Sequence, residues 1–388
     1  MRKDVMLMVK MNLKALATAI ILSGCTLSSS GITSEVAAPS ALSENNRVYS
    51  LIAAESGTQD LRNAAAALGY QAGEDIPLEG LGLIMVRYDL PQSVTGKQAI
   101  DALAAAVPAA TVGVNHAYRM QSTSQTPETR TYANTLLRWP QGGCPATMRV
   151  GVIDGGVDRS APKLADTKLV TVDFGQGSAA SIRHGTEVAS VLADPSRLTN
   201  VRLYSANVIS PDPSGEDAAG AAQIAQALNW MAEQDVKVVN LSLAGPKNKL
   251  LRLASQNASS RGLILVASAG NAGSTAPPQF PAAFDNVVAV TAVDARMNIY
   301  NQAVQGTHID VAAPGVDIFV ASASGGRYVT GTSMAAPFVT ARIAAQKGAS
   351  RDTLIADVTD LGPKGKDPVF GYGLINAGAA CGVSGKRP

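Results

Sequence analysis

A serine that could act as a nucleophile lies near the C-terminal end of the sequence, in the segment Gly331–Pro337. Gly331 and Thr332 predict a tight turn, and the Ala-rich residues after Ser333 predict a helix with Pro337 near its first turn. Ser333 would then lie at a helix N-terminus, where free backbone N–H groups and the helix dipole favour negative charge. Such a serine is either an N-cap or a nucleophile beside an oxyanion site, and taken alone the N-cap is the commoner case.

A nucleophilic serine needs a base, and the chain has three histidines. Only His184 has a context that suggests catalysis, because Gly185 and small residues after it would start a second helix and admit a substrate. The candidate carboxylate is Asp154, which ends the apolar run 148–153 before two glycines. A β-branched run that ends in Asp-Gly-Gly predicts a buried strand, and α/β sheets carry their sites at such strand ends.

A fourth candidate is Asn271, which follows the predicted strand 263–267 and could donate an amide N–H to an oxyanion. Each candidate also has an ordinary structural explanation. Asp154 could be a turn former, His184 a polar residue at a helix start, and Asn271 a turn residue between glycines. Their joint occurrence favours catalysis over these explanations.

In the order Asp154, His184, Asn271, Ser333, these residues resemble the subtilisin-like serine peptidases, or subtilases. The resemblance covers about residues 130–380 and includes the segments 238–246, 280–294 and 310–317. It implies an α/β subtilisin-like three-layer domain over 148–382, with a mainly parallel central sheet. It also implies that His184 takes the proton of Ser333, that Asp154 orients the imidazole, and that Asn271 holds the oxyanion. No cofactor and no metal are implied.

The same resemblance implies a polypeptide substrate that adds as a strand to the protein. The residues implied in binding are Ser242, Leu243 and Ala244 along the strand, and Ser268, Ala269 and Gly270 on the opposite wall of the first specificity pocket. Two other functions stay open: a binding or scaffold lipoprotein on a degenerate peptidase fold, and a lipid-facing esterase with the same triad. The intact site argues against the first, and the strand-binding segment argues against the second.

Four positions depart from the family pattern. Gly155 replaces a usual Ser or Thr after the aspartate, Glu187 replaces a second histidine, Phe338 replaces a histidine, and Ala244 replaces a glycine. The span 191–203 is also too short for the calcium loop of secreted relatives, so we expect no obligatory calcium. These changes leave the triad intact but are compatible with slow turnover or narrow specificity.

The N-terminus is predicted to be a targeting segment and not part of a fold. Residues 1–24 read as a signal peptide, and Leu22-Ser-Gly-Cys25 resembles the lipobox of bacterial lipoproteins, which implies a lipid on Cys25. The alternative is an ordinary cleaved secretory peptide. Residues 25–46 predict a flexible tether. The protein is thus expected to be exported and anchored in the cell envelope, at the outer membrane or the periplasmic face, and released if processed.

Residues 47–121 have a pattern of their own. They predict a strand at 47–52, a helix at 58–69, a strand at 81–88, a helix at 95–107 and an extended piece at 112–121. This small α+β, ferredoxin-like domain resembles the inhibitory propeptide of subtilases. Self-cleavage would fall between about Gln121 and Tyr132, within a linker 122–147. An unrelated accessory domain is the alternative.

Composition and the cysteines agree with an exported protein. If Cys25 carries lipid, Cys144 and Cys381 remain, and export favours a disulfide between them over two buried thiols. A net charge of +2 indicates no nucleic-acid partner. No apolar stretch reaches the ~18 residues of a membrane span. Residues 383–388 are expected to form a short tail.

Overall fold

The computed structural model describes residues 47–120, 123–124, 132–211, 217–322, 325–378 and 380–381. The predicted signal peptide, Cys25, the tether up to residue 46 and the tail 383–388 lie outside the described residues. In the part of the chain that is described, no helix is both long enough and apolar enough to cross a membrane.

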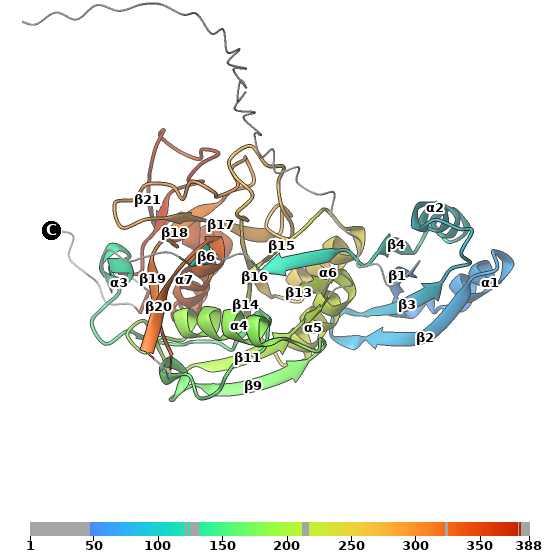
Figure 1. Ribbon diagram of the computed structural model, residues 1–388, viewed down its shortest axis with the longest axis horizontal. Coiled ribbons are helices and arrows are strands. Elements are labelled where there is room, and N and C mark those ends of the chain that lie inside the picture. Colours follow the sequence, from blue (N-terminus) through green and yellow to red (C-terminus); the bar gives the residue numbers. More distant parts are fainter. Residues whose placement is uncertain are drawn as a thin grey trace, which may run out of the picture. The chain divides into compact units, whose positions relative to one another are not determined.

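A nine-stranded sheet forms the centre of the larger domain (Figure 1). Its spatial order is β21-β22-β18-β17-β16-β14-β8-β11-β9, and all neighbours are parallel except β21 and β22. The strands are β8 (Val150–Asp154), β9 (Lys168–Asp173), β11 (Arg202–Asn207), β14 (Val238–Leu241), β16 (Ile264–Ser268), β17 (Val287–Val293), β18 (Val311–Pro314), β21 (Val358–Thr359) and β22 (Leu374–Ile375).

Helices cover both faces of this sheet. They are α4 (Ala179–Leu192), α5 (Ala221–Glu233), α6 (Lys249–Ser260) and α7 (Thr332–Ala345). Side chains alternate between the faces: Val150 and Val152 of β8 join the core that contains α4 and α7, whereas Ile153 joins the core that contains α5 and α6. The fold is therefore the three-layer subtilisin-like architecture that the sequence predicted.

Shorter elements complete this domain. They are α3 (Tyr132–Leu136), α8 (Arg351–Ile355), the 3-10 helix η3 (Pro162–Leu164), β7 (Cys144–Pro145), β10 (Leu198–Thr199), β12 (Ile209–Pro211), β13 (Asp217–Gly220), β15 (Leu243–Ala244), β19 (Ile318–Ser322) and β20 (Gly325–Thr330). The predicted linker 122–147 thus contains α3 and β7. Tyr132 of α3 donates its hydroxyl to the Val316 carbonyl at 2.6 Å, so this end of the linker packs with the larger domain.

A disulfide joins Cys144 of β7 to Cys381, with 5.4 Å between their Cα atoms and a sequence separation of 237. The bond connects the segment before the first catalytic strand with the end of the described chain. It therefore closes a loop that contains every candidate catalytic residue.

The N-terminal domain is a four-stranded antiparallel sheet with two helices. Its elements are β1 (Arg47–Ala53), η1 (Ala54–Ser56), α1 (Gln59–Ala67), β2 (Gln71–Leu78), η2 (Glu79–Leu81), β3 (Leu83–Asp89), α2 (Gly96–Ala106) and β4 (Thr111–Val114), with sheet order β2-β3-β1-β4. The sequence missed β2. This edge strand is largely exposed, contains a glycine and a proline, and has a register shift against β3, so it lacks the apolar alternation that marks a strand.

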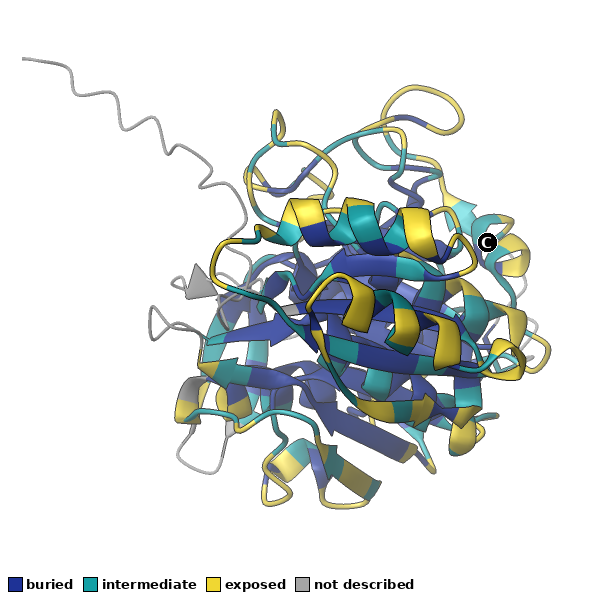
Figure 2. Cartoon of the chain, turned by 90° about the vertical axis from the view of Figure 1, so that its right-hand side faces the viewer, coloured by how far each residue is buried: buried dark blue, intermediate teal, exposed yellow. Residues whose placement is uncertain are grey.

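Both faces of the small sheet are buried. Val48 and Ile52 pack against α1 and α2, whereas Tyr49 and Leu51 join the catalytic-domain core around α5 and α6. Figure 2 shows the result: buried strands lie beneath helices whose outer faces are exposed. Alternate side chains of β1 therefore pack into two different hydrophobic cores.

The connection after β4 contacts the N-termini of α5 and α6. Asn115 accepts a hydrogen bond at 2.9 Å from the backbone N–H of Ala222, near the start of α5. Asn248, the N-cap of α6, donates to the Val114 carbonyl at 2.7 Å and lies 3.0 Å from Nδ1 of His116. These contacts satisfy polar groups at helix ends and tie the N-terminal domain to both helices.

Candidate active site

Asp154 lies at the C-terminal end of β8 and is fully buried. Its Oδ1 accepts from the Gly155 N–H at 2.7 Å and from the ring N–H at Nδ1 of His184, also at 2.7 Å. Oδ2 is buried and has no hydrogen-bond partner among the described residues. The missing family side chain at position 155 has a steric cause, because a Cβ there would lie 2.0 Å from the Ser181 carbonyl oxygen.

His184 lies on α4, whose N-terminus is closed by a capping box between Ser178 and Ser181. The sequence placed His184 at the start of the helix, but α4 begins at Ala179, five residues earlier. The helix comes close to the turn after β8, since a Cβ at Gly185 would lie 2.5 Å from the Gly155 carbonyl oxygen. This close approach brings the imidazole to Asp154.

The ring of His184 is buried, and burial alone would lower its pKa. The negative charge of Asp154 and its hydrogen bond raise the pKa of His184 above its usual value, Glu187 raises it further, and Arg327 opposes this rise. An imidazole with a buried carboxylate on Nδ1 keeps Nε2 as its acceptor nitrogen when neutral. The pair has the arrangement of a general base and its orienting group.

Ser333 is the second residue of α7, and every residue of that helix is buried. Its Oγ, like Nε2 of His184, is a buried atom without a hydrogen-bond partner among the described residues. Catalytic hydrogen bonds are often long before substrate binds. Ser333 Oγ and His184 Nε2, the two atoms that would exchange a proton, thus have no competing hydrogen bond among the described residues.

Pro337 is the sixth residue of α7, just after its first turn, because the helix begins at Thr332. Proline has no N–H, so it cannot donate to the carbonyl four residues earlier, which is that of Ser333. The Ser242 hydroxyl donates to this carbonyl instead, at 3.0 Å. Asn240 in turn donates to the Ser242 oxygen at 2.9 Å, so β14 holds the beginning of α7.

Asn271 follows β16 and contacts the residue before the nucleophile. Its Oδ1 accepts from the backbone N–H of Thr332 at 3.1 Å and from the Thr332 hydroxyl at 2.9 Å. Thr332 Oγ1 also accepts from the Gly270 N–H at 3.1 Å. With its oxygen engaged in this way, the Asn271 amide presents its N–H₂ group on the other side. The predicted oxyanion donor and nucleophile are therefore brought together.

The predicted substrate strand is occupied by another segment of this chain. Strand β5 (Ala117–Met120) runs antiparallel to β15, with Met120 opposite Leu243 and Arg119 opposite Ala244. On its other side β5 pairs with β13. The extended piece predicted at 112–121 is therefore two strands, β4 in the N-terminal sheet and β5 between β13 and β15.

A second short strand follows β5 in the sequence. β6 (Thr123–Ser124) pairs antiparallel with β20, with Thr123 opposite Thr330 and Ser124 opposite Val329. β20 ends three residues before Ser333, so β6 lies beside the strand that leads to the nucleophile.

On the opposite wall, Ser268 and Ala269 are buried and Ala269 donates its N–H to the Val290 carbonyl. Sequence reasoning missed Gln279, whose Oε1 would lie 2.1 Å from a Cβ at Gly270. It also missed Arg327, which pairs with Glu187. No short-range pattern signals either residue, because Gln279 lies outside any helix or strand and Arg327 contacts a residue 140 positions away.

Among the described residues, no group of three or more His, Cys, Asp or Glu side chains could hold a metal ion. The expectation that calcium is not required stays a prediction.

Comparison with known proteins agrees with this geometry. The Subtilase family profile matches residues 146–373. Subtilisin DY of Bacillus licheniformis is 32% identical over 264 residues, which cover 62% of this chain and 93% of the relative. Subtilisin E of Bacillus subtilis (strain 168) is 31% identical over 267 residues, covering 62% and 67%.

The fold is similar to the crystal structure of fervidolysin from Fervidobacterium pennivorans, described as a keratinolytic enzyme related to subtilisin. The TM-score is 0.68 at 20% identity, over 88% of this chain and 61% of that one. The family profile covers more than half of the chain, and the relatives match it over the same domain. The chain therefore belongs to the subtilase family of serine peptidases.

Proposed function

We propose that this chain is a serine endopeptidase whose catalytic residues are Asp154, His184 and Ser333. The observation that carries the proposal is the buried 2.7 Å contact between His184 and Asp154, in a domain that also holds the Ser333 hydroxyl buried at the start of α7. His184 takes the Ser333 proton as the hydroxyl attacks the peptide carbonyl, and Asp154 stabilises the imidazolium that forms. The imidazolium then protonates the leaving amine, and water hydrolyses the acyl-enzyme.

The tetrahedral oxyanion would be held by the Ser333 backbone N–H and the Asn271 amide. The hydrogen bonds from Thr332 to Asn271 Oδ1 support this role because they orient the amide. In a subtilisin, loss of one such donor lowers kcat by roughly 10²–10³, so Asn271→Ala should lower kcat by about that factor.

Residues 47–121 would be an inhibitory propeptide that the enzyme removes itself. The pairing of β5 with β13 and β15 supports this, because an antiparallel strand beside β15 takes the place of a substrate. The pairing of Met120 with β15 and of Thr123 with β20 supports a cut close to these residues, at the N-terminal end of the range from about Gln121 to Tyr132 that the sequence predicts.

A lipid on Cys25 would hold the uncut protein at the cell envelope, and the cut would separate the peptidase from that anchor. Mass analysis of the membrane-bound chain tests this, with a diacylglyceryl-modified N-terminal cysteine as the expected result. A chain that fractionates with the membrane equally well as Cys25→Ser would contradict the anchor.

The test of the enzyme uses the chain from Thr26 onward and its Ser333→Ala variant. Both are incubated with a fluorophosphonate probe and read by intact mass. We expect a probe adduct on Ser333 and loss of the segment up to about residues 121–132 in the unmodified chain alone. One uncut mass without an adduct in either protein would leave a binding protein on a peptidase fold. Cleavage of a short acyl ester without cleavage of casein would indicate an esterase.

A further inference from the structure

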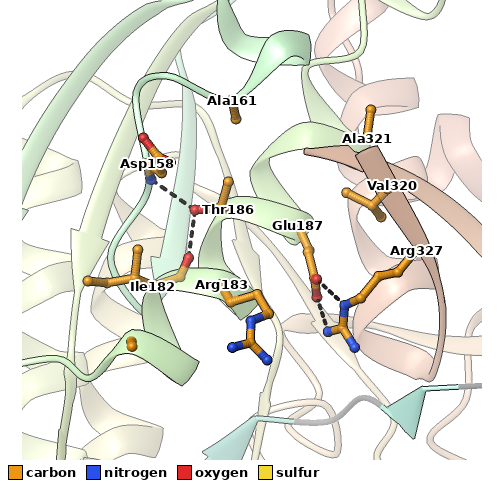
Figure 3. Close-up of a pocket in the computed structure, with 11 residues that line it drawn as sticks. Asp158, Ala161, Ile182, Arg183, Thr186, Glu187, Val320, Ala321 and Arg327 are labelled. Atoms are coloured by element: carbon orange, nitrogen blue, oxygen red, sulfur yellow. Dashed lines mark hydrogen bonds and ion pairs between the residues drawn. The ribbon is translucent and has the colours of Figure 1, made fainter. Parts of the chain in front are cut away.

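A half-buried ion pair connects the helix that carries the catalytic histidine with the strand that leads to the nucleophile (Figure 3). Glu187 lies on α4, one turn after His184, and its side chain is 7% exposed. Arg327 of β20 donates to both carboxylate oxygens of Glu187, from Nε at 2.6 Å and from Nη2 at 2.8 Å. Such a two-pronged bond between planar groups fixes orientation as well as distance.

Strand β20 has a second partner on its other side. It pairs with β19 along one edge and with β6 along the other, where Thr123 lies opposite Thr330. On the proposed function, the residues of a substrate that follow the cut bond, its primed residues, would occupy the place of β6. Arg327 therefore belongs to the strand that such residues extend, and it is anchored at the same time to the helix of the general base.

We propose that Glu187 and Arg327 are positioning residues that couple the binding of primed substrate residues on β20 to the placement of His184. This inference rests on the proposed peptidase function. The ion pair holds β20 against α4, so that a peptide which adds to β20 meets a strand already fixed relative to the imidazole. A substrate without primed residues makes no use of this strand and gains nothing from the pair.

The surroundings of the pair fit this role. It lines a cavity of about 470 Å³ between α4 and the β19–β20 hairpin, bordered by Asp158, Arg183 and Ile182. Figure 3 shows the side chains of Glu187 and Arg327 pointing toward each other and joined directly, among the residues that line this cavity. Pairing also keeps the charges next to the base in balance. The charged groups that act on His184 are Asp154 of β8, Glu187 of its own helix and Arg327 of β20.

The test compares Glu187→Gln, Arg327→Gln and the double variant with the parent enzyme after self-processing. Each is measured on an internally quenched peptide with four primed residues, and on a p-nitroanilide with the same residues before the cut bond. We expect kcat/KM to fall about tenfold more for the peptide than for the p-nitroanilide in each single variant. The double variant should show the same selective loss of kcat/KM on the peptide, because the link between α4 and β20 is still missing.

The pH profile on the p-nitroanilide supplies a readout that a merely structural role would not change. Loss of the Glu187 charge leaves Arg327 to lower the pKa of His184, so the acid limb should move to lower pH. Loss of Arg327 leaves the carboxylate unopposed, so the acid limb should move to higher pH. The double variant should lie between the two. Lys237→Gln, at an exposed pair with Asp235, is the matched control and should change neither substrate.

An equal loss on both substrates with an unmoved acid limb would overturn the proposal and leave a structural ion pair. If a variant does not mature, hydrogen exchange in the uncut Ser333→Ala chain decides the matter. Glu187→Gln should speed exchange of the β20 amides, and unchanged exchange would refute the coupling. A parent enzyme that cleaves neither substrate would instead refute the proposed function, and exchange in β20 would then test the link alone.

Discussion

Ser242 offers a test of how the nucleophile's helix is held. In Ser242→Ala, two buried groups lose a partner: the Ser333 carbonyl, which accepts from the hydroxyl at 3.0 Å, and the Asn240 side-chain N–H, which donates to it at 2.9 Å. Both partners are fully buried. Water therefore cannot replace the lost hydrogen bonds without entering the core.

The size of the effect follows from these two groups. A buried polar group left without a partner costs about 1–3 kcal/mol, so the two groups together should lower the free energy of unfolding of Ser242→Ala by about 2–6 kcal/mol. The loss should also reach the active site, because the carbonyl belongs to the nucleophile itself. We expect kcat to fall more than KM rises, since the substrate strand β15 does not depend on the Ser242 hydroxyl.

Pro337 provides the control. Pro337→Ala restores an N–H that can donate to the Ser333 carbonyl, which makes the Ser242 hydroxyl partly redundant. Chemical unfolding of both single variants and the double variant, all in the inactive Ser333→Ala chain, gives the coupling energy. We expect the double variant to be more stable than the sum of the single effects by about 1–3 kcal/mol. Strictly additive effects would show that the carbonyl does not link the two residues, and the reasoning would fail.

Three further predictions concern other parts of the chain. Gly155→Ser restores the usual family residue but should abolish cleavage of the internally quenched peptide, because its Cβ would meet the Ser181 carbonyl oxygen at 2.0 Å. Gly156→Ser is the control and should keep this activity, because its Cβ would meet only the Ile182 side chain, at 3.1 Å. Replacing Cys144 and Cys381 by Ser should lower the free energy of unfolding by up to ~5 kcal/mol, and a reductant should then change the unfolding curve of the parent alone. Burial lowers the pKa of His116, so its contribution to the stability of the uncut chain is present above about pH 6.5 and is lost as the pH falls below it. His116→Gln in the Ser333→Ala chain should therefore lose less stability between neutral and acid pH, and an unchanged pH dependence would exclude the histidine.

The fold of the catalytic domain could be predicted because its signals are local. β8 is a continuous apolar run that ends in Asp154, and every residue of that strand is buried. Asn271 likewise follows a strand, and Ser333 lies at the start of a helix. Their positions in the sequence therefore indicate where they lie relative to the sheet. Parallel strands present their C-terminal ends at one edge, and this geometry brought the candidate residues together.

The parts that could not be predicted depend on long-range contacts or on exact boundaries. Glu187 and Arg327 are 140 residues apart, and nothing near either residue indicates the other. Strand β2 is recognisable only through its pairing with β3. The position of Pro337 within α7 follows from where the helix begins, and the turn before Ser333 placed that start only to within a few residues.

The strand β5 and the strand β15 that it pairs with belong to the same chain. While the connection is intact, a short tether makes the local concentration of such a strand about millimolar, whatever the amount of protein around it. Once the connection is cut, the fraction of peptidase domains that still bind β5 depends on the affinity of the N-terminal domain for the peptidase domain and on the concentrations of both. The contacts of Tyr49 and Leu51 with the core around α5 and α6 would then set a dissociation constant. At the high concentration of a crowded surface, β5 would stay bound and the peptidase inhibited. After dispersal, dilution would release β5 and free the substrate-binding strand.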